Sequence, residues 1–468
     1  MGRLLIVDRE GEDQRTEPAA DVGGDLGAVG RELRSLGATH PLWSAALTAQ
    51  MRRSLDALAS RTLPSAELTL AFDQLARQMV SIPAFNASGL LASIQESFGS
   101  ARFGEVPRFD FTPAFRALTR AATYSSPDPP KSFYSEAMTS PGAYFANDEA
   151  RIDSFEGLTS AISSLISKTP QLRLVWRGHR DAEWGIHSAL FRRLMEVNDV
   201  RRPQARPKVK QSYPDEEQMI RAESEILRVA RTDWRFDGLS ALETFARIQH
   251  AGGPTRLLDV TKNPFIGAWF AVEASPDVDE TDGRLIAFAT TPVLGPDDDG
   301  PRVDTRIELD EEWGDRTPPW HRWDDTIARQ AVDWGTGARR RLWVPPAYDP
   351  RILSQNAAFL IDGVPITSHN TQSYFRSSSR EEPATYWTRA DLLAASSIYA
   401  KTFKPGRKPR SNQHNFAPTF TFRIEAQAKA EIREYLVSRF GYTHSYIYPD
   451  VAALADFVAN MEMPRLGP

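Results

Sequence analysis

Residues 247–273 place charged side chains between a tight turn and a long apolar run, in the sequence RIQHAGGPTRLLDVTKNPFIGAWFAVE. Arg256 and Asp259 stand among leucine and valine residues, and charged side chains are rarely buried unless they are paired. Because the two residues are three positions apart, we expect them to pair with each other or with a ligand. The Gly-Gly-Pro at 252–254 predicts a fixed turn before them. The apolar run 265–272 predicts a buried helix or strand.

The composition excludes several classes of protein. The chain has 468 residues, which is typical of two or three domains, and 41% of them are hydrophobic, as in globular proteins. No run reaches the roughly 18 apolar residues of a membrane helix, and acidic residues end the apolar start too early for a signal peptide. The absence of cysteine excludes disulfides, thiolate metal sites and a cysteine nucleophile. We therefore expect a cytoplasmic protein that does not contact a membrane. The net charge of −5 argues against a strongly basic nucleic-acid binder but leaves a local basic patch open.

The first part of the chain predicts three segments. Residues 1–24 are expected to form a short strand and a polar tether. Residues 25–123 carry apolar side chains at steps of three and four, which predicts a helical N-terminal region that serves as a scaffold or binds a partner. Residues 124–147 include Ser-Ser-Pro-Asp-Pro-Pro and predict a linker. Residues 148–468 are then expected to form a separate domain.

The pattern from residue 148 onward predicts interleaved helices and strands without a regular βαβ order, which favours an α+β fold. Insertions are expected near 294–341 and 368–416. In the helix predicted over 215–229, four glutamates are expected to face solvent, namely Glu216, Glu217, Glu223 and Glu225. Helices are predicted at 152–166, 215–229, 239–249 and 426–440, the last ending at Gly441, and strands at 172–176, 285–290, 352–361 and 420–424.

Four motifs in order resemble the FRG domain, a bacterial family named for a Phe/Tyr-Arg-Gly tripeptide. They are the Gln-His…Arg-Leu-Leu-Asp stretch at 249–259, Trp-Arg-Gly-His at 176–179, Arg-Ile-Leu-Ser-Gln at 351–355 and Tyr-Pro-Asp at 448–450. At the second motif, tryptophan replaces the usual Phe or Tyr. The resemblance covers roughly residues 150–460.

Arg177 and Gly178 predict an anion-binding position at the exit of a strand. Glycine lets a ligand approach the main chain, and the planar arginine fork suits a phosphate. The strand-Arg-Gly pattern also resembles the first motif of mono-ADP-ribosyltransferases, in which the arginine holds the NAD diphosphate. The alternative is a structural arginine paired with Asp259 or Asp181.

Residues 355–361, Gln-Asn-Ala-Ala-Phe-Leu-Ile, resemble a catalytic segment of DNA-targeting ADP-ribosyltransferase toxins. The catalytic glutamate of that segment corresponds to Ala358, and without a carboxylate the developing positive charge of the transition state loses its partner. Either Gln355 or a carboxylate such as Asp259 replaces it, or the protein binds its ligand without transferring a group. The resemblance implies an ADP-ribosyltransferase-like mixed-sheet core, NAD as substrate, and a bacterial toxin or anti-phage defence effector that transfers ADP-ribose or hydrolyses NAD.

The residues also leave an alternative function open. The alternative is a non-catalytic module that binds a nucleotide or nucleic acid, and the basic loops 201–210 and 404–410 are solvated loops or nucleic-acid contacts. The acceptor would be a nucleic acid or a protein, and an antitoxin or other partner would bind the N-terminal helical region. No metal site is expected, because no histidine pair has ligand spacing. The catalytic candidates are Asp259, Gln355 and His250, and the cofactor-binding candidates are Arg177, Gly178, Arg256 and Thr255. Five of them are expected to converge on one cleft, namely Arg177, His250, Arg256, Asp259 and Gln355.

Overall fold

The computed structural model describes most of the chain from residue 133 onward. The described residues are 133–203, 210–293, 314–323, 325–367, 371, 374–377, 385–409, 416–459 and 461. The chain divides into two units, Met1–Ala122 and Thr123–Pro468, and all described residues belong to the second. The predictions for residues 1–24 and for the helical region 25–123 therefore lie outside the described residues.

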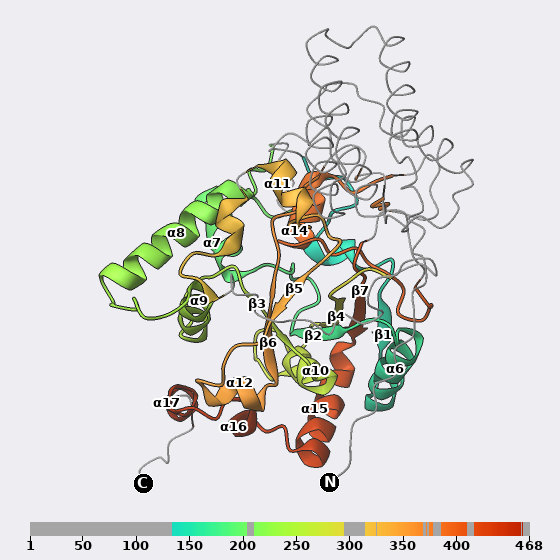
Figure 1. The fold of residues 1–468 in the computed structure, drawn as a ribbon. Helices are drawn as coiled ribbons and strands as arrows, with labels where there is room; N and C mark the ends of the chain where they lie inside the picture. Colours follow the sequence, from blue (N-terminus) through green and yellow to red (C-terminus); the bar gives the residue numbers. More distant parts are fainter. Residues whose placement is uncertain are drawn as a thin grey trace, which may run out of the picture. The chain divides into compact units, whose positions relative to one another are not determined.

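A mixed seven-stranded sheet forms the centre of the described residues (Figure 1). Its strands follow the spatial order β1-β7-β4-β2-β3-β6-β5. Among the described strands, β1 pairs in parallel with β7, and the other neighbours pair antiparallel. The predicted α+β fold is confirmed. The strands are β1 (Ala150–Ile152), β2 (Leu174–His179), β3 (Leu258–Thr261), β4 (Gly283–Ala289), β5 (Arg341–Trp343), β6 (Ala357–Ile361) and β7 (Thr419–Ile424).

Three helices cover one face of the sheet, namely α6 (Phe155–Lys168), α10 (Pro264–Val272) and α15 (Ala426–Phe440). Helix α10 is apolar around most of its surface, so it can lie between the strands and α15 (Figure 1). Trp176 of β2 and Leu285 of β4 belong to this core. The apolar run at 265–272 is thus a buried helix.

The opposite face packs against α7 (Ala189–Val197), α14 (Arg389–Ala395) and the 3-10 helix η1 (Pro141–Tyr144). Val175 of β2 and Val260 of β3 face this second core. Successive side chains of a strand point to opposite faces, so Val175 and its neighbour in β2 enter different cores.

A third apolar cluster lies at the β6 and β5 side of the sheet. It contains residues from α8 (Glu216–Thr232), α9 (Ala241–His250) and the 3-10 helix η4 (Pro319–Arg322). Trp320 and Trp334 are fully buried here, with their rings stacked at a centroid distance of 5.1 Å. The remaining described helices are α11 (Thr326–Ala331), α12 (Pro350–Ser354), α16 (His444–Ile447) and α17 (Val451–Ala459).

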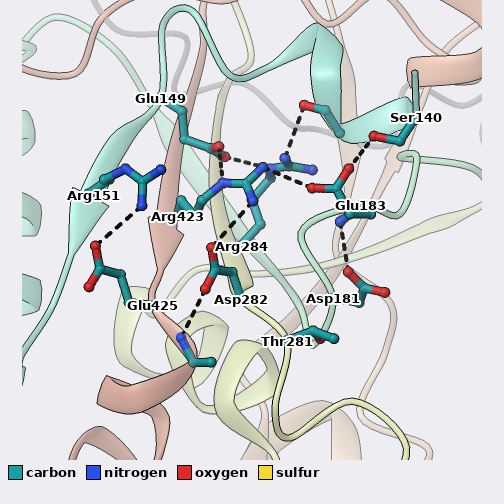
Figure 2. A network of polar contacts seen from close by, with 12 residues as sticks. Ser140, Glu149, Arg151, Asp181, Glu183, Thr281, Asp282, Arg284, Arg423 and Glu425 are labelled. Carbon is teal, nitrogen blue, oxygen red and sulfur yellow. Dashed lines mark hydrogen bonds and ion pairs between the residues drawn. The ribbon is translucent and has the colours of Figure 1, made fainter. Parts of the chain in front are cut away.

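Buried charges tie the segment before β1 to the neighbouring strands (Figure 2). The carboxylate of Glu149 accepts from Arg284 of β4 at 2.6 Å and from Arg423 of β7 at 2.9 Å. Arg423 also pairs with Glu183 at 3.1 Å and with Asp282 at 3.4 Å. Burial of Glu149 and Arg284 is tolerated because each has a partner of opposite charge, so the network is a structural clamp.

Most elements predicted from the sequence are present with shifted ends. Gly441 ends α15 in the left-handed region at φ 71°, as the C-cap prediction requires. The strand predicted over 352–361 is partly wrong, because its first part belongs to α12 and the strand begins at Ala357. The end of the predicted linker packs into the sheet core through the buried Tyr144 and Phe145.

Candidate functional site

Arg177 and Asp259 lie beside each other on the neighbouring strands β2 and β3. The Nη1 of Arg177 donates to the main-chain oxygen of Asp259 at 2.7 Å, and it lies 3.8 Å from the carboxylate. The Asp259 side chain is 66% exposed, whereas that of Arg177 is 18% exposed. Arg177 lies inside β2 rather than at its exit. The pair therefore presents a solvent-exposed carboxylate beside a mostly buried cation.

The turn before β3 and the end of α9 hold Asp259 in place. Gln249 Nε2 donates to Asp259 Oδ1 at 2.8 Å and to the main-chain oxygen of Leu257 at 3.2 Å. The buried Thr255 hydroxyl donates to Gln249 Oε1 and accepts from the Leu257 amide. Thr255 is predicted to bind cofactor, but its hydroxyl instead positions Gln249. Gln249 in turn orients the carboxylate of Asp259.

His179 fixes the other side of the arginine. Arg177 Nε donates to His179 Nε2 at 3.0 Å, so that ring nitrogen carries no proton and the neutral imidazole has its hydrogen on Nδ1. Burial lowers the pKa of His179 well below its ordinary value, and the charges of Arg177, Arg284 and Arg192 lower it further. A neutral His179 can accept from Arg177 and does not repel it.

Arg192 of α7 adds a second positive charge to this region. Burial lowers the pKa of Arg177, and Arg192 lowers it further, while the charge of Asp259 opposes both effects. Asp259 raises the pKa of Arg192 against the lowering by desolvation. The charge of Asp259 therefore acts on both arginines, and the charge of Glu196 also raises the pKa of Arg192.

Arg256 belongs to a different, buried cluster, so its predicted pairing with Asp259 is wrong. Its guanidinium lies 2.8 Å from Glu216 and 2.6 Å from Glu223, and it lies over the rings of Trp320 and Trp334. Both glutamates are buried, which contradicts the prediction that they face solvent. Burial opposes the charge of Arg256, but the two glutamates raise its pKa above the ordinary value. This cluster stabilises the fold and leaves Arg256 with no free face for a phosphate.

His250 and Gln355 make contacts away from the Arg177 pair. His250 Nε2 lies 2.8 Å from Asp349, which also caps α12. Gln355 Nε2 donates to the main-chain oxygen of Ile447 at 3.0 Å, and its main-chain oxygen accepts from Thr261 at 2.7 Å. The predicted site residues thus separate into several groups, and Arg177 and Asp259 are the two that touch.

Gly178 and Ala358 have structural reasons for their small size. A Cβ on Gly178 would lie 2.2 Å from the Gly267 oxygen and 2.4 Å from the Ala271 nitrogen, so glycine allows α10 to pack on β2. Ala358 is buried opposite Val260 in the apolar core. A glutamate at position 358 would enter that core, so this position lies outside any solvent-exposed site.

Sequence reasoning missed Arg192 and the role of Gln249. Arg192 lies in the amphipathic pattern of α7, and only the packing of that helix on the sheet brings it near β2. Gln249 stood in a recognised motif, yet its partner Asp259 is ten residues away across a turn. Neither the approach of Arg192 to β2 nor the contact of Gln249 with Asp259 follows from the spacing of these residues in the sequence.

The described chain is therefore an α+β protein with an arginine–carboxylate site on adjacent strands of a mixed sheet. Residues 172–280 match the model of the FRG domain family, and this range contains Arg177, Gln249 and Asp259. The match supports the predicted FRG resemblance over that range, while an ADP-ribosyltransferase-like core stays a prediction. No curated protein and no solved structure matches the chain. Within the described part of the chain, every helix is too short or too polar to span a bilayer, and no group of acidic or histidine side chains is placed to hold a metal.

Proposed function

We propose that this chain is an NAD-consuming enzyme with an ADP-ribosyltransferase-like core, acting as a bacterial toxin or anti-phage defence effector. The observation that carries the proposal is the Arg177–Asp259 pair. The Nη2 of Arg177 donates to none of the described residues, and the adjacent carboxylate is largely exposed. A cationic donor can bind a phosphate group of a substrate, and a largely exposed carboxylate beside it can stabilise positive charge that develops on the same substrate.

In the proposed reaction, the bond between nicotinamide and ribose breaks, and the nicotinamide leaves with the bonding electron pair. Water, or a nucleophilic group of a nucleic acid or protein, forms the new bond to the ribosyl carbon and releases a proton. Asp259 would stabilise the oxocarbenium-like transition state, and Gln249 would keep its carboxylate oriented through the 2.8 Å hydrogen bond. Arg177 would bind a phosphate of NAD.

The second candidate is a non-catalytic module that binds a nucleotide or nucleic acid. It is favoured by the buried position of Ala358, where related transferases carry their catalytic glutamate. In that case, Arg177 would bind phosphate and Asp259 would only set its surroundings.

The test incubates the full chain with NAD labelled in its adenine half, first alone and then with DNA, RNA or cell extract. Nicotinamide release measures cleavage, and labelled macromolecule measures transfer. Arg177→Ala should weaken binding at least about tenfold, since a charged hydrogen bond contributes about 1.5–3 kcal/mol. Asp259→Asn should bind NAD and lose turnover.

Asp199→Asn is the matched control. Asp199 is 71% exposed and pairs with Arg201 at 2.6 Å, so the change again removes one exposed carboxylate beside an arginine. Its positive φ of 53° also suits asparagine. Arg177-dependent binding without nicotinamide release would favour the binding module. If NAD does not bind at all, NAD chemistry is refuted.

A further inference from the structure

Trp184 lies in the turn that follows β2, and it is 42% exposed. Tryptophan is highly buried on average in folded proteins, and most of the described tryptophans of this chain are buried. The indole nitrogen of Trp184 donates a hydrogen bond to none of the described residues. The side chain therefore presents part of its aromatic surface to solvent without being held by a polar partner.

The main chain of the turn holds Trp184 in place. Its amide donates to the Asp181 oxygen at 3.3 Å, and its own oxygen lies 3.5 Å from Nη1 of Arg284. The carboxylate of the preceding residue, Glu183, pairs with Arg423 at 3.1 Å in the structural clamp (Figure 2). The position of Trp184 is thus fixed through its main chain, and the carboxylate next to it in sequence is already engaged.

Two contacts connect Trp184 with Arg177. Arg177 and His179 are two positions apart in β2, so their side chains point to the same face of the sheet. On that face, Arg177 Nε donates to His179 Nε2 at 3.0 Å. The ring centroids of His179 and Trp184 are 6.3 Å apart. One imidazole ring therefore separates the exposed indole from the guanidinium.

We propose that Trp184 is a ring-stacking residue of the Arg177 site, and that the ligand places a flat aromatic ring on Trp184 and a phosphate on Arg177. A nucleotide has this form, because a sugar joins its ring to its phosphate. Stacking on an aromatic side chain accepts any flat ring, so the ring is either adenine or nicotinamide. The identification of the ligand with NAD rests on the proposed function, whereas a nucleotide site at Trp184 and Arg177 does not require NAD chemistry.

The test measures binding of AMP, nicotinamide mononucleotide and inorganic pyrophosphate to the full chain by calorimetry. Trp184→Ala should weaken binding of one of the two nucleotides at least about tenfold, as expected for loss of aromatic stacking. Binding of pyrophosphate, which has no ring, should not change. Trp184→Tyr and Trp184→Leu form a second pair, since both keep an apolar contact with His179 but only tyrosine keeps an aromatic face. The tyrosine variant should retain nucleotide binding, and the leucine variant should lose it.

Trp234→Ala is the matched control. Trp234 lies after α8 and is 65% exposed, so the change removes another exposed indole. In the described part of the chain, Trp234 makes no ring contact or side-chain hydrogen bond with Arg177, His179 or Asp259. Its replacement should leave the affinity of every probe unchanged.

The outcomes distinguish the two rings and the two proposals. A larger effect of Trp184→Ala on AMP identifies adenine as the stacked ring, and a larger effect on nicotinamide mononucleotide identifies nicotinamide. Nucleotide binding that depends on both Trp184 and Arg177, without any NAD cleavage, supports the stacking site and refutes the NAD-consuming enzyme. Unchanged NAD cleavage and nucleotide affinity in Trp184→Leu would retain the enzyme and refute the stacking site. Equal effects of Trp184→Ala and Trp234→Ala, or no nucleotide binding by the unmodified protein, also overturn this inference.

Discussion

Arg177 donates a 2.7 Å hydrogen bond to the main-chain oxygen of Asp259, while its Nη1 lies 3.8 Å from the carboxylate. The guanidinium of Arg177 is thus held by hydrogen bonds to the main chain of β3 and to His179, and the carboxylate of Asp259 adds a longer ion pair. Because that carboxylate is 66% exposed, it can also act on a ligand.

Asp259→Asn should fold normally and lose activity. Asp259 is 66% exposed and lies 3.8 Å from Arg177, so water screens the ion pair and its contribution to stability is less than about 1 kcal/mol. Asparagine can keep the hydrogen bond from Gln249 through its own oxygen. Thermal unfolding and a growth assay of cells that express the variant test this together. A strongly destabilised variant, or a stable and fully toxic one, contradicts a catalytic role of Asp259.

The wrong pairing predicted for Arg256 shows that a three-residue spacing indicates a side-chain contact only within a helix. Residues three apart face each other on a helix, but Arg256 precedes β3, where no such helix exists. A signal for the correct partners was present in α8. Its buried stripe contains Glu216, Met219 and Glu223, so two glutamates lie on the apolar face of the helix. A buried carboxylate needs a cation, and the sequence alone cannot show from which distant segment it comes.

Arg256→Leu should destabilise the fold strongly. It would leave the carboxylates of Glu216 and Glu223 buried without their cation, which costs about 3–5 kcal/mol. Arg228→Leu is the control, because Arg228 is 55% exposed and pairs with an exposed Glu225 on α8. It should change the free energy of unfolding little, because exposed ion pairs contribute little to stability. Similar unfolding free energies of the two variants in urea titrations would show that the buried cluster is not a stabilising unit.

The ends of helices and strands could be predicted where nearby residues determine them, but not where contacts with distant segments determine them. The end of α15 at Gly441 follows from the glycine itself, because few other residues adopt φ 71° without strain. The start of α12 also had local signals, Asp349 as N-cap and Pro350 at the first position. The apolar residues that follow favour a strand, and this is why the strand predicted over 352–361 is wrong in its first part.

Gly178→Ala should lower stability and leave ligand binding by the folded protein unchanged. The added methyl group would meet the main chain of α10 at 2.2 Å, and overpacking of this kind costs about 1–3 kcal/mol. At Gly238, a Cβ would meet no atom within 4 Å, so Gly238→Ala should change stability little. Melting temperatures and ADP-ribose affinities of both variants give the comparison. A stable Gly178→Ala variant with lost affinity would instead mean that ligand approaches this glycine.

Asp362 should make stability fall as pH rises from about 4 to about 6. Its side chain is buried, and burial raises its pKa to about 6 against hydrogen bonds from the Gly335 and Gly363 amides that lower it. Between the ordinary pKa of 3.8 and the folded value, the unfolded chain has released this proton and the folded chain still holds it. The folded state then binds more protons, so the free energy of unfolding decreases with pH, by about 3 kcal/mol over the interval. Asp362→Asn cannot ionise and should lose this decrease, whereas the exposed control Asp199→Asn should keep it. Urea unfolding at pH 4 and pH 7 measures both, and parallel profiles for the unmodified protein and Asp362→Asn would mean that Asp362 does not titrate in this window.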